Sequence, residues 1–362
     1  MQDSLKIMHG LSEVAGQNYL SVRGLREIGE DAETAVWDKH AFGYPYDICL
    51  GIDKHKKYLL PIYAIKLAAF FVTALFRFNT FHFHYGRSIL NNHELWLYDL
   101  IGKQYFYEFH GSDLRDYERF CRNSAMPFTA DLAMHPKLKK RNEIICKKAK
   151  QIILHDDELI PYLPAIHSPI QVIPLRVDLS LFHPQYPSDV DTGTVRIVHA
   201  PSKRSSKGTD FVIGAINRLK ERYPEVELIL VEGKTQEEAK AIYATADIVV
   251  DQLLIGTYGV FSVESMALGK PVVTYITDAM KERLPEELPI VSASVDTVES
   301  ALESLICNAR LRHDLGVKGR RYAETYHDYK KVATVLRKIY NGECKPATGR
   351  EAFERVKNVP LE

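Results

Sequence analysis

This chain of 362 residues has no excess of charge of either sign, because 47 Lys and Arg residues balance 47 Asp and Glu residues. That balance excludes a global attraction to nucleic acid, so we expect no nucleic-acid partner. Cysteine is scarce, and the five cysteines lie too far apart for the paired spacing of a zinc site or a redox dithiol: Cys49, Cys121, Cys146, Cys307 and Cys344. We interpret them as free thiols in a reducing compartment. Met1–Ser4 lacks the pattern of a secretory signal, so a cytoplasmic protein is expected.

Long apolar runs are also rare, and the longest one is interrupted. Residues Leu59–Phe76 are apolar almost throughout but contain Pro61 and Lys66, and Arg77 follows them. A membrane-spanning helix needs ~20 apolar residues, and a central lysine costs it roughly 3 kcal/mol. We therefore expect a buried helix of the N-terminal half, with a surface helix that touches a membrane as the alternative.

A second segment in the same half is strongly basic. Lys137–Lys150 contains seven Lys or Arg residues and a single acid, Glu143. The expected role is a solvated helix face. The alternative is contact with anionic lipid headgroups, to which each basic residue near the surface contributes ~1 kcal/mol. Together the two segments leave peripheral attachment to the inner membrane face as the alternative to a freely cytoplasmic location.

Strand and helix patterns alternate along the chain, and six prolines crowd residues 161–187 between two such runs. Repeated β-α-β order predicts parallel sheets with helices on both faces. The proline-rich segment marks a boundary. We expect an α/β chain of two Rossmann-like domains, residues 1–177 and 178–341, followed by a C-terminal segment at 342–362. A long final helical stretch is expected over Leu311–Tyr340.

Two loops of the second half carry the clearest chemistry. Ligands of open parallel sheets bind beyond the carboxyl ends of the strands, where Pro201–Gly208 follows an apolar strand and contains three cations, Lys203, Arg204 and Lys207. Cations there can neutralise the charge that develops on a leaving phosphate. The alternative is a solvated basic loop. The Walker spacing for a nucleotide-binding P-loop is absent.

The second loop ends where a helix is expected to begin at Val260, directly after Gly259, and that helix is expected to stop at Gly269. Helix N-termini present unpaired N–H groups and partial positive charge, so they hold anions such as phosphates. Glu264, one turn further on, can accept hydrogen bonds from sugar hydroxyls. A diphosphate beside a ribose is the shape of a nucleotide.

These motifs resemble those of the GT-B-fold glycosyltransferases of the glycogen-synthase-like, nucleotide-sugar-using group (glycosyltransferase family 4-like). Ala246-Asp247 and Glu264–Val273 align without a gap to the family's alanine-aspartate and glutamate…glycine-x-proline-valine-valine hallmarks. Further similar segments lie across both halves: Phe109–Arg115, Val172–Asp178 with Leu181–Pro184, and Ser206–Asp210. The resemblance extends from about residue 5 to residue 340.

The resemblance implies the GT-B fold, in which two Rossmann-like domains face a cleft, and a C-terminal segment that returns to the N-terminal domain. It implies a metal-independent hexosyltransferase that needs no cofactor. The enzyme would transfer sugar from a nucleoside-diphosphate hexose (NDP-hexose) to a hydroxyl of a glycan or lipid-linked acceptor, with retention of configuration. Such enzymes commonly build cell-surface polysaccharide or glycolipid, which is an argument from fold-level analogy.

Residue roles follow from the resemblance. Glu264 would bind the ribose hydroxyls and Lys207 the diphosphate, while His110 would reach the donor sugar from the opposite domain, so that His110 and Lys207 are the catalytic candidates. The full set expected at the nucleotide-sugar is Gly16, Ser202, Lys203, Arg204, Lys207, Gly256, Tyr258, Gly259, Val260, Phe261 and Glu264. Asp113 and Arg115 are expected on the acceptor side, with Asp113 acting as a brace of its loop rather than as a base.

The chain departs from the family pattern at three places. The first glutamate of the Glu-x7-Glu motif falls on Gly256, and the arginine expected before the phosphate-binding lysine falls on Ser202. The third departure is a missing strand between Glu227 and Asp247. The family usually has a strand there that helps to seat the nucleotide base, so the sequence does not distinguish uridine, guanosine and adenosine donors. Two alternatives therefore stay open: a GT-B sugar-nucleotide epimerase, and a catalytically silent nucleotide-sugar-binding partner of another enzyme.

Two smaller clusters consist of residue types that can bind a metal ion. His82 and His84 alternate along a strand and so face one side, but no third ligand is spaced to join them, and packed or hydrogen-bonded histidines are expected. Asp156-Asp157-Glu158 stands where a helix would begin after a strand, so helix capping is expected. The sequence therefore predicts no metal site.

Overall fold

The computed structural model describes residues 4–39, 43–53, 55–122, 136–191 and 193–360. The chain divides into two compact units. Unit 1 comprises the described residues up to Asp116, residues 136–176, and the chain from Tyr329 onward, and unit 2 comprises residues 117–122 and Val177–Asp328. The second unit therefore ends at Asp328, whereas the sequence placed the end of the second domain at residue 341.

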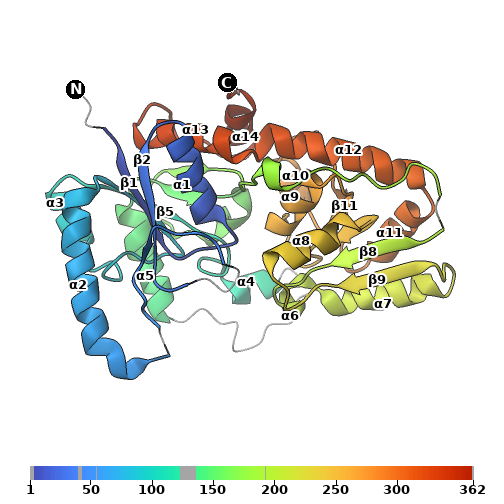
Figure 1. The fold of residues 1–362 in the computed structure, drawn as a ribbon, viewed down its shortest axis with the longest axis horizontal. Helices are drawn as coiled ribbons and strands as arrows, with labels where there is room; N and C mark the ends of the chain where they lie inside the picture. Colours follow the sequence, from blue (N-terminus) through green and yellow to red (C-terminus); the bar gives the residue numbers. More distant parts are fainter. Residues whose placement is uncertain (1–3, 40–42, 54, 123–135, 192, 361–362) are drawn as a thin grey trace. The chain divides into compact units, whose positions relative to one another are not determined.

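The sheet of unit 1 is parallel throughout, as the β-α-β order predicts. Its seven strands lie in the order β3-β2-β1-β4-β5-β6-β7 (Figure 1). Their bounds are β1 Lys6–Leu11, β2 Asp31–Val36, β3 Ile48–Cys49, β4 Thr80–His84, β5 Gln104–Glu108, β6 Ile152–Leu154 and β7 Ile170–Val172. The short strands β3 and β7 at the two edges were not expected from the sequence.

One face of this sheet is covered by α1 (Gln17–Glu27), α13 (Tyr329–Tyr340) and α14 (Gly349–Lys357). Buried side chains of α13, among them Val332 and Leu336, share a hydrophobic core with Ile7 of β1 and Val22 of α1. This packing is the reason that residues 329–341 belong to unit 1. Helix α13 is separate from α12 (Ala309–Tyr326), so the single helical stretch expected over 311–340 is two helices.

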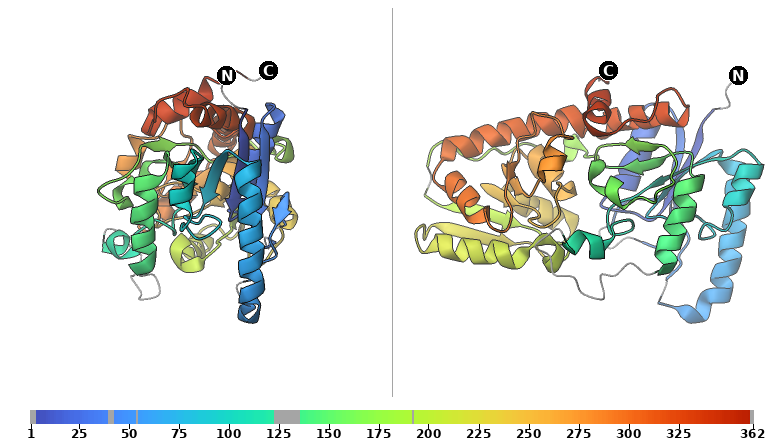
Figure 2. Two further views of the ribbon diagram at one scale, coloured as in Figure 1. Left: turned by 90° about the vertical axis from the view of Figure 1, so that its left-hand side faces the viewer. Right: turned by 180° about the vertical axis from the view of Figure 1, so that it is seen from behind.

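The other face carries α2 (Leu60–Arg77), α3 (Leu95–Leu100) and α5 (Pro136–Lys148), which Figure 2 shows on one side of the sheet. Successive side chains of a strand point to opposite faces. In β4, Phe81 and Phe83 therefore turn toward α3, where both rings stack with Tyr98. His82 and His84 turn toward the face that α1 and α13 cover.

Helix α2 is not the buried helix that the sequence led us to expect. Its buried residues are Tyr63, Phe71 and Ala74, and 17% of its 18-residue apolar window is buried. By length and composition it is the one helix of the described residues that could cross a membrane. The expectation was wrong because only one side of α2 contacts the rest of unit 1.

Unit 2 has a second parallel sheet, with strand order β12-β11-β10-β8-β9. Its strands are β8 Val195–His199, β9 Val226–Leu230, β10 Ile248–Val250, β11 Val272–Thr274 and β12 Val291–Ser292. Helices α7 (Thr209–Lys220) and α11 (Val298–Ile306) share one hydrophobic core with this sheet. The remaining elements of unit 2 include the short helices α4 Tyr117–Arg122, α6 Arg204–Lys207 and α10 Asp278–Lys281, together with α8 Gln236–Ala244 and α9 Val260–Ala267. Two parallel α/β units confirm the predicted fold class.

Candidate functional site

Lys207 stands at the centre of a polar cluster at the carboxyl edge of the unit 2 sheet. It is the last residue of α6, and Gly208 follows it with a φ of 76°, a left-handed conformation that glycine adopts without strain. The ammonium of Lys207 lies 2.7 Å from Oδ1 of Asp251 and 2.8 Å from Oε1 of Gln252, both of which follow β10. The basic loop after β8 and the loop after β10 are thereby joined.

Asp251 connects this lysine to the start of α9. Its Oδ2 accepts hydrogen bonds from the Ser262 hydroxyl at 2.7 Å and from the Gly259 N–H at 3.3 Å. Burial alone would raise the pKa of Asp251, but the charge of Lys207 and these hydrogen bonds hold that pKa below its usual value. A Cβ built on Gly259 would lie 3.7 Å from the Lys207 ammonium, so backbone and cation are close neighbours at the helix N-terminus.

Glu264 lies one turn further along α9 and differs from its neighbours. Burial raises the pKa of its carboxyl to about 7, with the charges of Lys240 and Asp251 acting in opposite directions. In the part of the chain that the structure describes, no hydrogen bond or ion pair involves this carboxylate. An unpaired, largely buried carboxylate is costly, and a ligand with hydroxyl donors would satisfy it.

Gly256 falls where the sequence resemblance places the first glutamate of the Glu-x7-Glu motif, and the structure leaves no room for a side chain there. A Cβ at this position would lie 2.3 Å from Cγ2 of Thr277, which is too close for any real contact. Thr277 is itself held in place, since its hydroxyl caps α10 and its N–H donates to the Gly256 carbonyl at 3.1 Å. The space of the missing glutamate is therefore filled from α10.

The other residues expected at the nucleotide-sugar differ in how exposed their side chains are and in what those side chains contact. Ser202 and Lys203 are exposed, whereas the Arg204 guanidinium forms a two-pronged ion pair with Glu232, at 2.6 and 2.9 Å. The Tyr258 side chain is buried, with its hydroxyl 3.2 Å from both the Tyr322 hydroxyl and Nε2 of His327. Only the backbone of Tyr258 is left to face a ligand. Val260 and Phe261 form the first turn of α9, where their N–H groups precede the helical hydrogen bonds.

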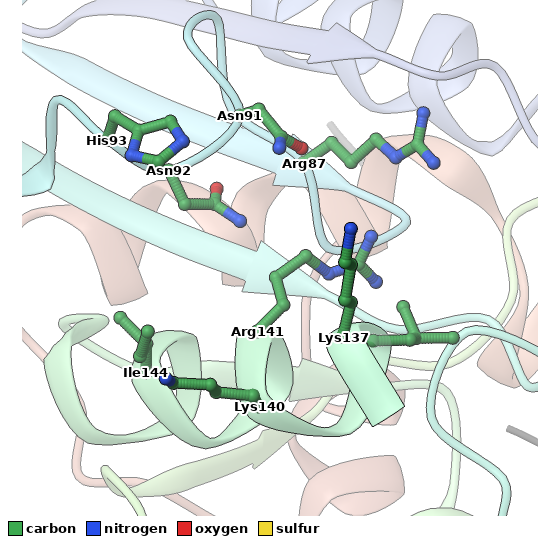
Figure 3. A pocket seen from close by; sticks show the side chains of 9 residues that line it. Arg87, Asn91, Asn92, His93, Lys137, Lys140, Arg141 and Ile144 are labelled. Atoms are coloured by element: carbon green, nitrogen blue, oxygen red, sulfur yellow. The ribbon is translucent and has the colours of Figure 1, made fainter. Parts of the chain in front are cut away.

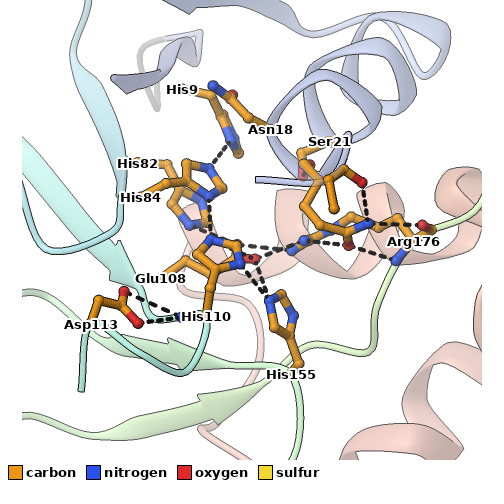
Figure 4. Close-up of polar contacts among 12 residues, drawn as sticks. His9, Asn18, Ser21, His82, His84, Glu108, His110, Asp113, His155 and Arg176 are labelled. Atoms are coloured by element: carbon orange, nitrogen blue, oxygen red, sulfur yellow. Dashed lines mark hydrogen bonds and ion pairs between the residues drawn. The ribbon is translucent and has the colours of Figure 1, made fainter. Parts of the chain in front are cut away.

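Unit 1 contains a second polar cluster, at the carboxyl ends of four neighbouring strands (Figure 4). We call it the histidine cluster; its members are His9, His82, His84, Glu108, His110, His155, Arg176 and Tyr340. Strand register brings them together, because His9 pairs with His82 across β1 and β4, and His84 pairs with Glu108 across β4 and β5. His155 follows directly after β6, and His110 is the second residue after the end of β5.

Glu108 and Arg176 form the charged base of this cluster. Both side chains are fully buried, and the guanidinium holds the carboxylate through two hydrogen bonds of 2.7 and 2.9 Å. Burial alone would raise the pKa of Glu108, but Arg176 and the surrounding histidines hold that pKa well below its usual value. Gln17 completes the arrangement, since its side chain bonds the backbone N–H and carbonyl of Arg176.

The histidines form a continuous chain of hydrogen bonds that runs from His155 to His82, which lies beside Glu108. His155 Nε2 lies 2.8 Å from His110 Nδ1, and His110 Nε2 lies 3.0 Å from His84 Nδ1. From His84 Nε2 the chain continues to His9 Nδ1 at 3.2 Å, and from His9 Nε2 to the Tyr340 hydroxyl at 2.9 Å. The last hydrogen bond runs from Tyr340 to His82 Nδ1 at 2.5 Å. His82 Nε2 has no hydrogen-bond partner among the described residues and lies 3.0 Å from Glu108 Oε2 as an ion-pair contact.

This geometry fixes which nitrogen donates in every hydrogen bond between the histidines. Burial lowers the pKa of His9, His82, His84, His110 and His155, so all five are neutral near pH 7 and each has one donor and one acceptor nitrogen. His82 Nε2 must carry hydrogen because it faces a carboxylate. Its Nδ1 then accepts from Tyr340, and the same alternation assigns hydrogen to Nε2 of every histidine in turn.

His110 is the sequence-predicted catalytic residue in this chain. Both of its ring nitrogens are used, one by His84 and one by His155, so a sugar could be contacted only by giving up one of these bonds. Asp113 acts as the expected brace, since its Oδ1 accepts from the His110 and Gly111 N–H groups at 3.0 and 2.9 Å. Burial raises the pKa of Asp113 to about 6.

Two further expected residues of unit 1 are also fixed locally. The guanidinium of Arg115 pairs with Glu158 at 2.5 and 2.9 Å, and Asp156 caps the following turn by accepting from the Glu158 N–H at 2.9 Å. The capping expected for Asp156 is thereby confirmed. Gly16 precedes α1 with a φ of 79°, and a Cβ there would approach the Tyr44 ring at 3.0 Å.

The expectation that no third ligand would join His82 and His84 was wrong. One ligand atom from each of His9, His82 and His84 lies within 4.8 Å of the others, and the same holds for His84, Glu108 and His110. A cation here would compete with Arg176, which already neutralises Glu108, and would break the hydrogen bonds between the rings. The donor set therefore fits a hydrogen-bonded cluster better than a metal centre.

The sequence analysis gave no role to several residues of these two clusters, although His9 and Gln252 begin loops that the strand-end rule marks as ligand-binding. Asp251 and Gln252 follow an apolar strand, and His9 and His155 lie at or after the ends of others, so position at a strand's carboxyl end was the available signal. For Arg176 no such signal exists. It lies in the proline-rich segment, and only the folded chain brings it to Glu108.

Comparisons with known proteins agree with this architecture. No protein-family model matches the chain. Over 202 residues it is 26% identical to the MMP alpha-(1->4)-mannosyltransferase of Mycolicibacterium hassiacum, an alignment that covers 47% of this chain and 48% of that protein. The chain thus spans about half the length of the curated relative it matches.

Solved structures match nearly the whole chain at low sequence identity. The sucrose-phosphate synthase from Thermosynechococcus elongatus has a TM-score of 0.66 at 14% identity, covering 93% of this chain and 98% of that one. Anabaena HepE, in complex with UDP and glucose, has a TM-score of 0.62 at 13% identity, covering 93% and 99%. These likenesses show that the chain has the GT-B fold, in a form divergent from the known members.

Proposed function

We propose that this chain is a glycosyltransferase that moves a hexose from a nucleoside-diphosphate donor to an acceptor hydroxyl. The observation that carries the proposal is the cluster at the carboxyl edge of the unit 2 sheet. There the Lys207 ammonium lies beside the N-terminus of α9, and the unpaired Glu264 carboxylate stands about one helical turn further along that helix. A nucleotide-sugar bound along this edge would place its diphosphate at Lys207 and the N-terminus of α9, and its ribose at Glu264.

The proposed chemistry assigns a role to each group. The bond between the anomeric carbon and the diphosphate oxygen breaks, a bond to the acceptor oxygen forms, and the acceptor proton leaves with the diphosphate. Lys207 and the N–H groups of the first turn of α9 meet the charge that grows on the departing diphosphate. Glu264 accepts hydrogen bonds from the ribose hydroxyls and so orients the nucleotide.

We propose that the reaction needs no divalent ion, because Lys207 and the α9 N-terminus supply the positive charge in place of one. We also propose retention of configuration, which rests on the sequence resemblance. Activity that survives a chelator supports the first proposal, and proton NMR of the product anomer tests the second. Loss of activity in the chelator, restored by a divalent ion, would contradict the first.

The hexosyl donor and the acceptor class are proposed from the relatives. The match to a mannosyltransferase supports a hexose, and the HepE structures, which contain UDP, UDP-glucose or UDP with glucose, support a nucleotide-sugar. WaaG, another structure of the same fold with a TM-score of 0.59, is described as involved in lipopolysaccharide biosynthesis. We propose a glycan or lipid-linked acceptor in cell-surface polysaccharide or glycolipid synthesis, at the cytoplasmic side of a membrane.

The test is a panel of nucleoside diphosphates and their hexoses, first by thermal shift and then by release of nucleoside diphosphate. A ligand selective for the native state raises its melting temperature in proportion to occupancy. We expect one nucleotide series to stabilise the protein, and its hexose to be consumed when an extracted glycan or lipid acceptor is added. If no nucleotide in the panel shifts the melting temperature, the proposed function is wrong.

Gly256 favours one other function, a catalytically silent nucleotide-sugar-binding partner of another transferase. The contact that the family's first glutamate makes with the donor sugar is lost, and Thr277 fills its place. Such a partner would bind the same donor in the thermal-shift panel but release no diphosphate with any acceptor. The two functions therefore separate in the second half of the same experiment.

A further inference from the structure

Helix α2 exposes an apolar stripe that points away from the body of unit 1. Ile62, Ile65, Ala69, Val72 and Phe76 recur at intervals of three and four residues, which places them on one side of a helix. That side is opposite the three residues by which α2 packs on unit 1, at 100° per residue. The exposures are large, reaching 71% for Ile65 and 87% for Phe76.

Helix α3 extends this apolar surface toward α5. The Phe71 ring of α2 packs against Tyr98 of α3 with centroids 6.0 Å apart, and Asp99 of α3 pairs with Lys148 of α5 at 3.0 Å. Between these contacts α3 exposes Trp96, to 61%, and Leu100. The three helices thus form one continuous surface on the same side of the sheet, which we call the α2–α3–α5 face (Figure 2).

The α5 side of this face is cationic. Lys140 and Lys147 are exposed there, along with Ile144, and Glu143 is the only acid of the helix. A cavity of about 520 Å³ lies between α5 and the loop that leads to α3 (Figure 3). Four cations line it, together with neutral polar side chains: Arg87, Lys137, Lys140, Arg141, Asn91, Asn92 and His93.

The cavity brings like charges together. Burial and the nearby positive charge of Arg87 lower the pKa of Arg141 to about 10, and its guanidinium lies against Gly86, where a Cβ would meet Nη2 at 2.6 Å. The two guanidinium groups brought together in this cavity repel each other, and a bound anion would relieve that repulsion. A phosphate is the anion that the guanidinium fork fits best.

A soluble chain rarely leaves an apolar surface of this kind uncovered. Self-association through this face would bring the lysines of two α5 helices together, which disfavours a second copy as its cover. An anionic bilayer satisfies both halves of the face, because acyl chains receive the apolar side chains and phosphate headgroups receive the cations. An exposed tryptophan between them is typical of the boundary between lipid and water.

We propose that the α2–α3–α5 face docks this protein on an anionic bilayer, with α2 lying in the interface and headgroup phosphates at α5. Helix α2 lies on the membrane rather than across it, because Tyr63, Phe71 and Ala74 remain packed on unit 1. The proposal does not depend on the reaction proposed above. It concerns a surface of unit 1 that contains none of the residues assigned to the donor.

The test is cosedimentation of the full chain with vesicles of phosphatidylcholine, with and without phosphatidylglycerol. We expect binding to the anionic vesicles at least about tenfold tighter than to the neutral ones, since several cations each contribute. The double substitution Ile65→Glu/Val72→Glu should abolish binding. The double substitution Lys140→Glu/Lys147→Glu should weaken it by about tenfold or more and remove the preference for anionic lipid.

Matched controls use exposed residues away from the face. Leu181 and Val190 of unit 2 are exposed to 50% and 64%, so Leu181→Glu/Val190→Glu introduces the same charges on comparable apolar positions. Lys234→Glu/Lys345→Glu reverses two other exposed lysines. Both controls should bind vesicles as the parent does. Circular dichroism confirms the fold of each variant, and nucleotide binding is measured separately so that a failed donor assay does not bear on the result.

Three outcomes would overturn the proposal. The first is equal binding to neutral and anionic vesicles, and the second is unchanged binding of the Ile65→Glu/Val72→Glu variant. The third is a concentration-dependent dimer in analytical ultracentrifugation that this same variant abolishes, because a second copy would then be the cover of the face.

Discussion

The two polar clusters of this chain differ in how far their groups satisfy one another. In the histidine cluster of unit 1 every imidazole bonds its neighbours, and the Glu108 carboxylate is held by Arg176 through two hydrogen bonds. In the cluster of unit 2, Lys207 and Asp251 are paired, but Glu264 has no partner among the described residues. The first network is closed except at His82 Nε2, His155 Nδ1 and Arg176 Nε, which have no hydrogen-bond partner among the described residues, whereas the second leaves a whole carboxylate in reserve.

This difference separates two uses of buried polarity. A closed network specifies one arrangement of its side chains, because any displacement leaves a donor or acceptor unpaired at a cost of about 1–3 kcal/mol. An unpaired carboxylate lowers the stability of the free protein, and a ligand that donates hydrogen bonds to it offsets this loss on binding. The comparison therefore predicts that substitutions in unit 1 act mainly on folding, and that those in unit 2 act mainly on binding.

The largest effect is expected for Arg176→Met. It leaves the Glu108 carboxylate buried without its cation, and breaking a buried pair in this way costs about 3–5 kcal/mol. Chemical denaturation at pH 7 measures the loss. Arg204→Met is the matched control, since its ion pair with Glu232 is exposed and its removal should leave the unfolding midpoint unchanged. Equal losses in the two variants would show that burial is not the source of the difference.

Acid should destabilise unit 1 through the same cluster. Histidines whose pKa is lowered in the folded state bind fewer protons than they do when unfolded, so stability is present above pH 6.5 and is lost as pH falls. For His155, whose pKa is lowered to about 4, the loss between these values approaches about 3 kcal/mol. Denaturation curves between pH 7 and 4 measure it, and His155→Gln should flatten the slope. A parent slope near zero in this range would contradict the assignment of neutral histidines.

The strand and helix alternation, both parallel sheets and the α9 N-terminus could be predicted from the sequence, because each depends on local patterns of apolar residues and glycines. The histidine cluster could not. His9, His84, His110 and His155 come from four strands, and only the strand order β1-β4-β5-β6 makes them neighbours. For α2, the apolar pattern was visible, but which side of a helix remains uncovered depends on the helices beside it.

A smaller loss of stability is expected at Gly256, where Thr277 fills the space of a side chain. Gly256→Ala places a methyl group against Cγ2 of Thr277, and overpacking of this kind costs about 1–3 kcal/mol. The second substitution Thr277→Ser removes that methyl group while keeping the hydroxyl that caps α10. Thermal denaturation should show that the double variant recovers most of the loss. If Thr277→Ser gives no rescue, the space at Gly256 is limited by something other than this contact.

The smallest effect on stability, and the sharpest on function, is expected for Glu264→Gln. The raised pKa of about 7 means that the free protein is destabilised as pH rises from 4.5 toward 7, because the unfolded chain loses the proton of this carboxyl there while the folded chain keeps it. Replacing it by a neutral amide should therefore stabilise the free protein at pH 8 by on the order of 1 kcal/mol. At pH 4, where the Glu264 carboxyl is mostly protonated in both the folded and the unfolded chain, the two proteins should unfold alike.

Donor binding should change in the opposite direction. A carboxylate accepts two ribose hydroxyl bonds more strongly than an amide does, so calorimetry at pH 8 should show about tenfold weaker nucleotide binding for Glu264→Gln. A variant that is more stable and yet binds the donor less well is the signature of a group held in reserve for a ligand. If Glu264→Gln binds nucleotide as tightly as the parent, Glu264 is not the ribose anchor and the contrast between the two clusters fails.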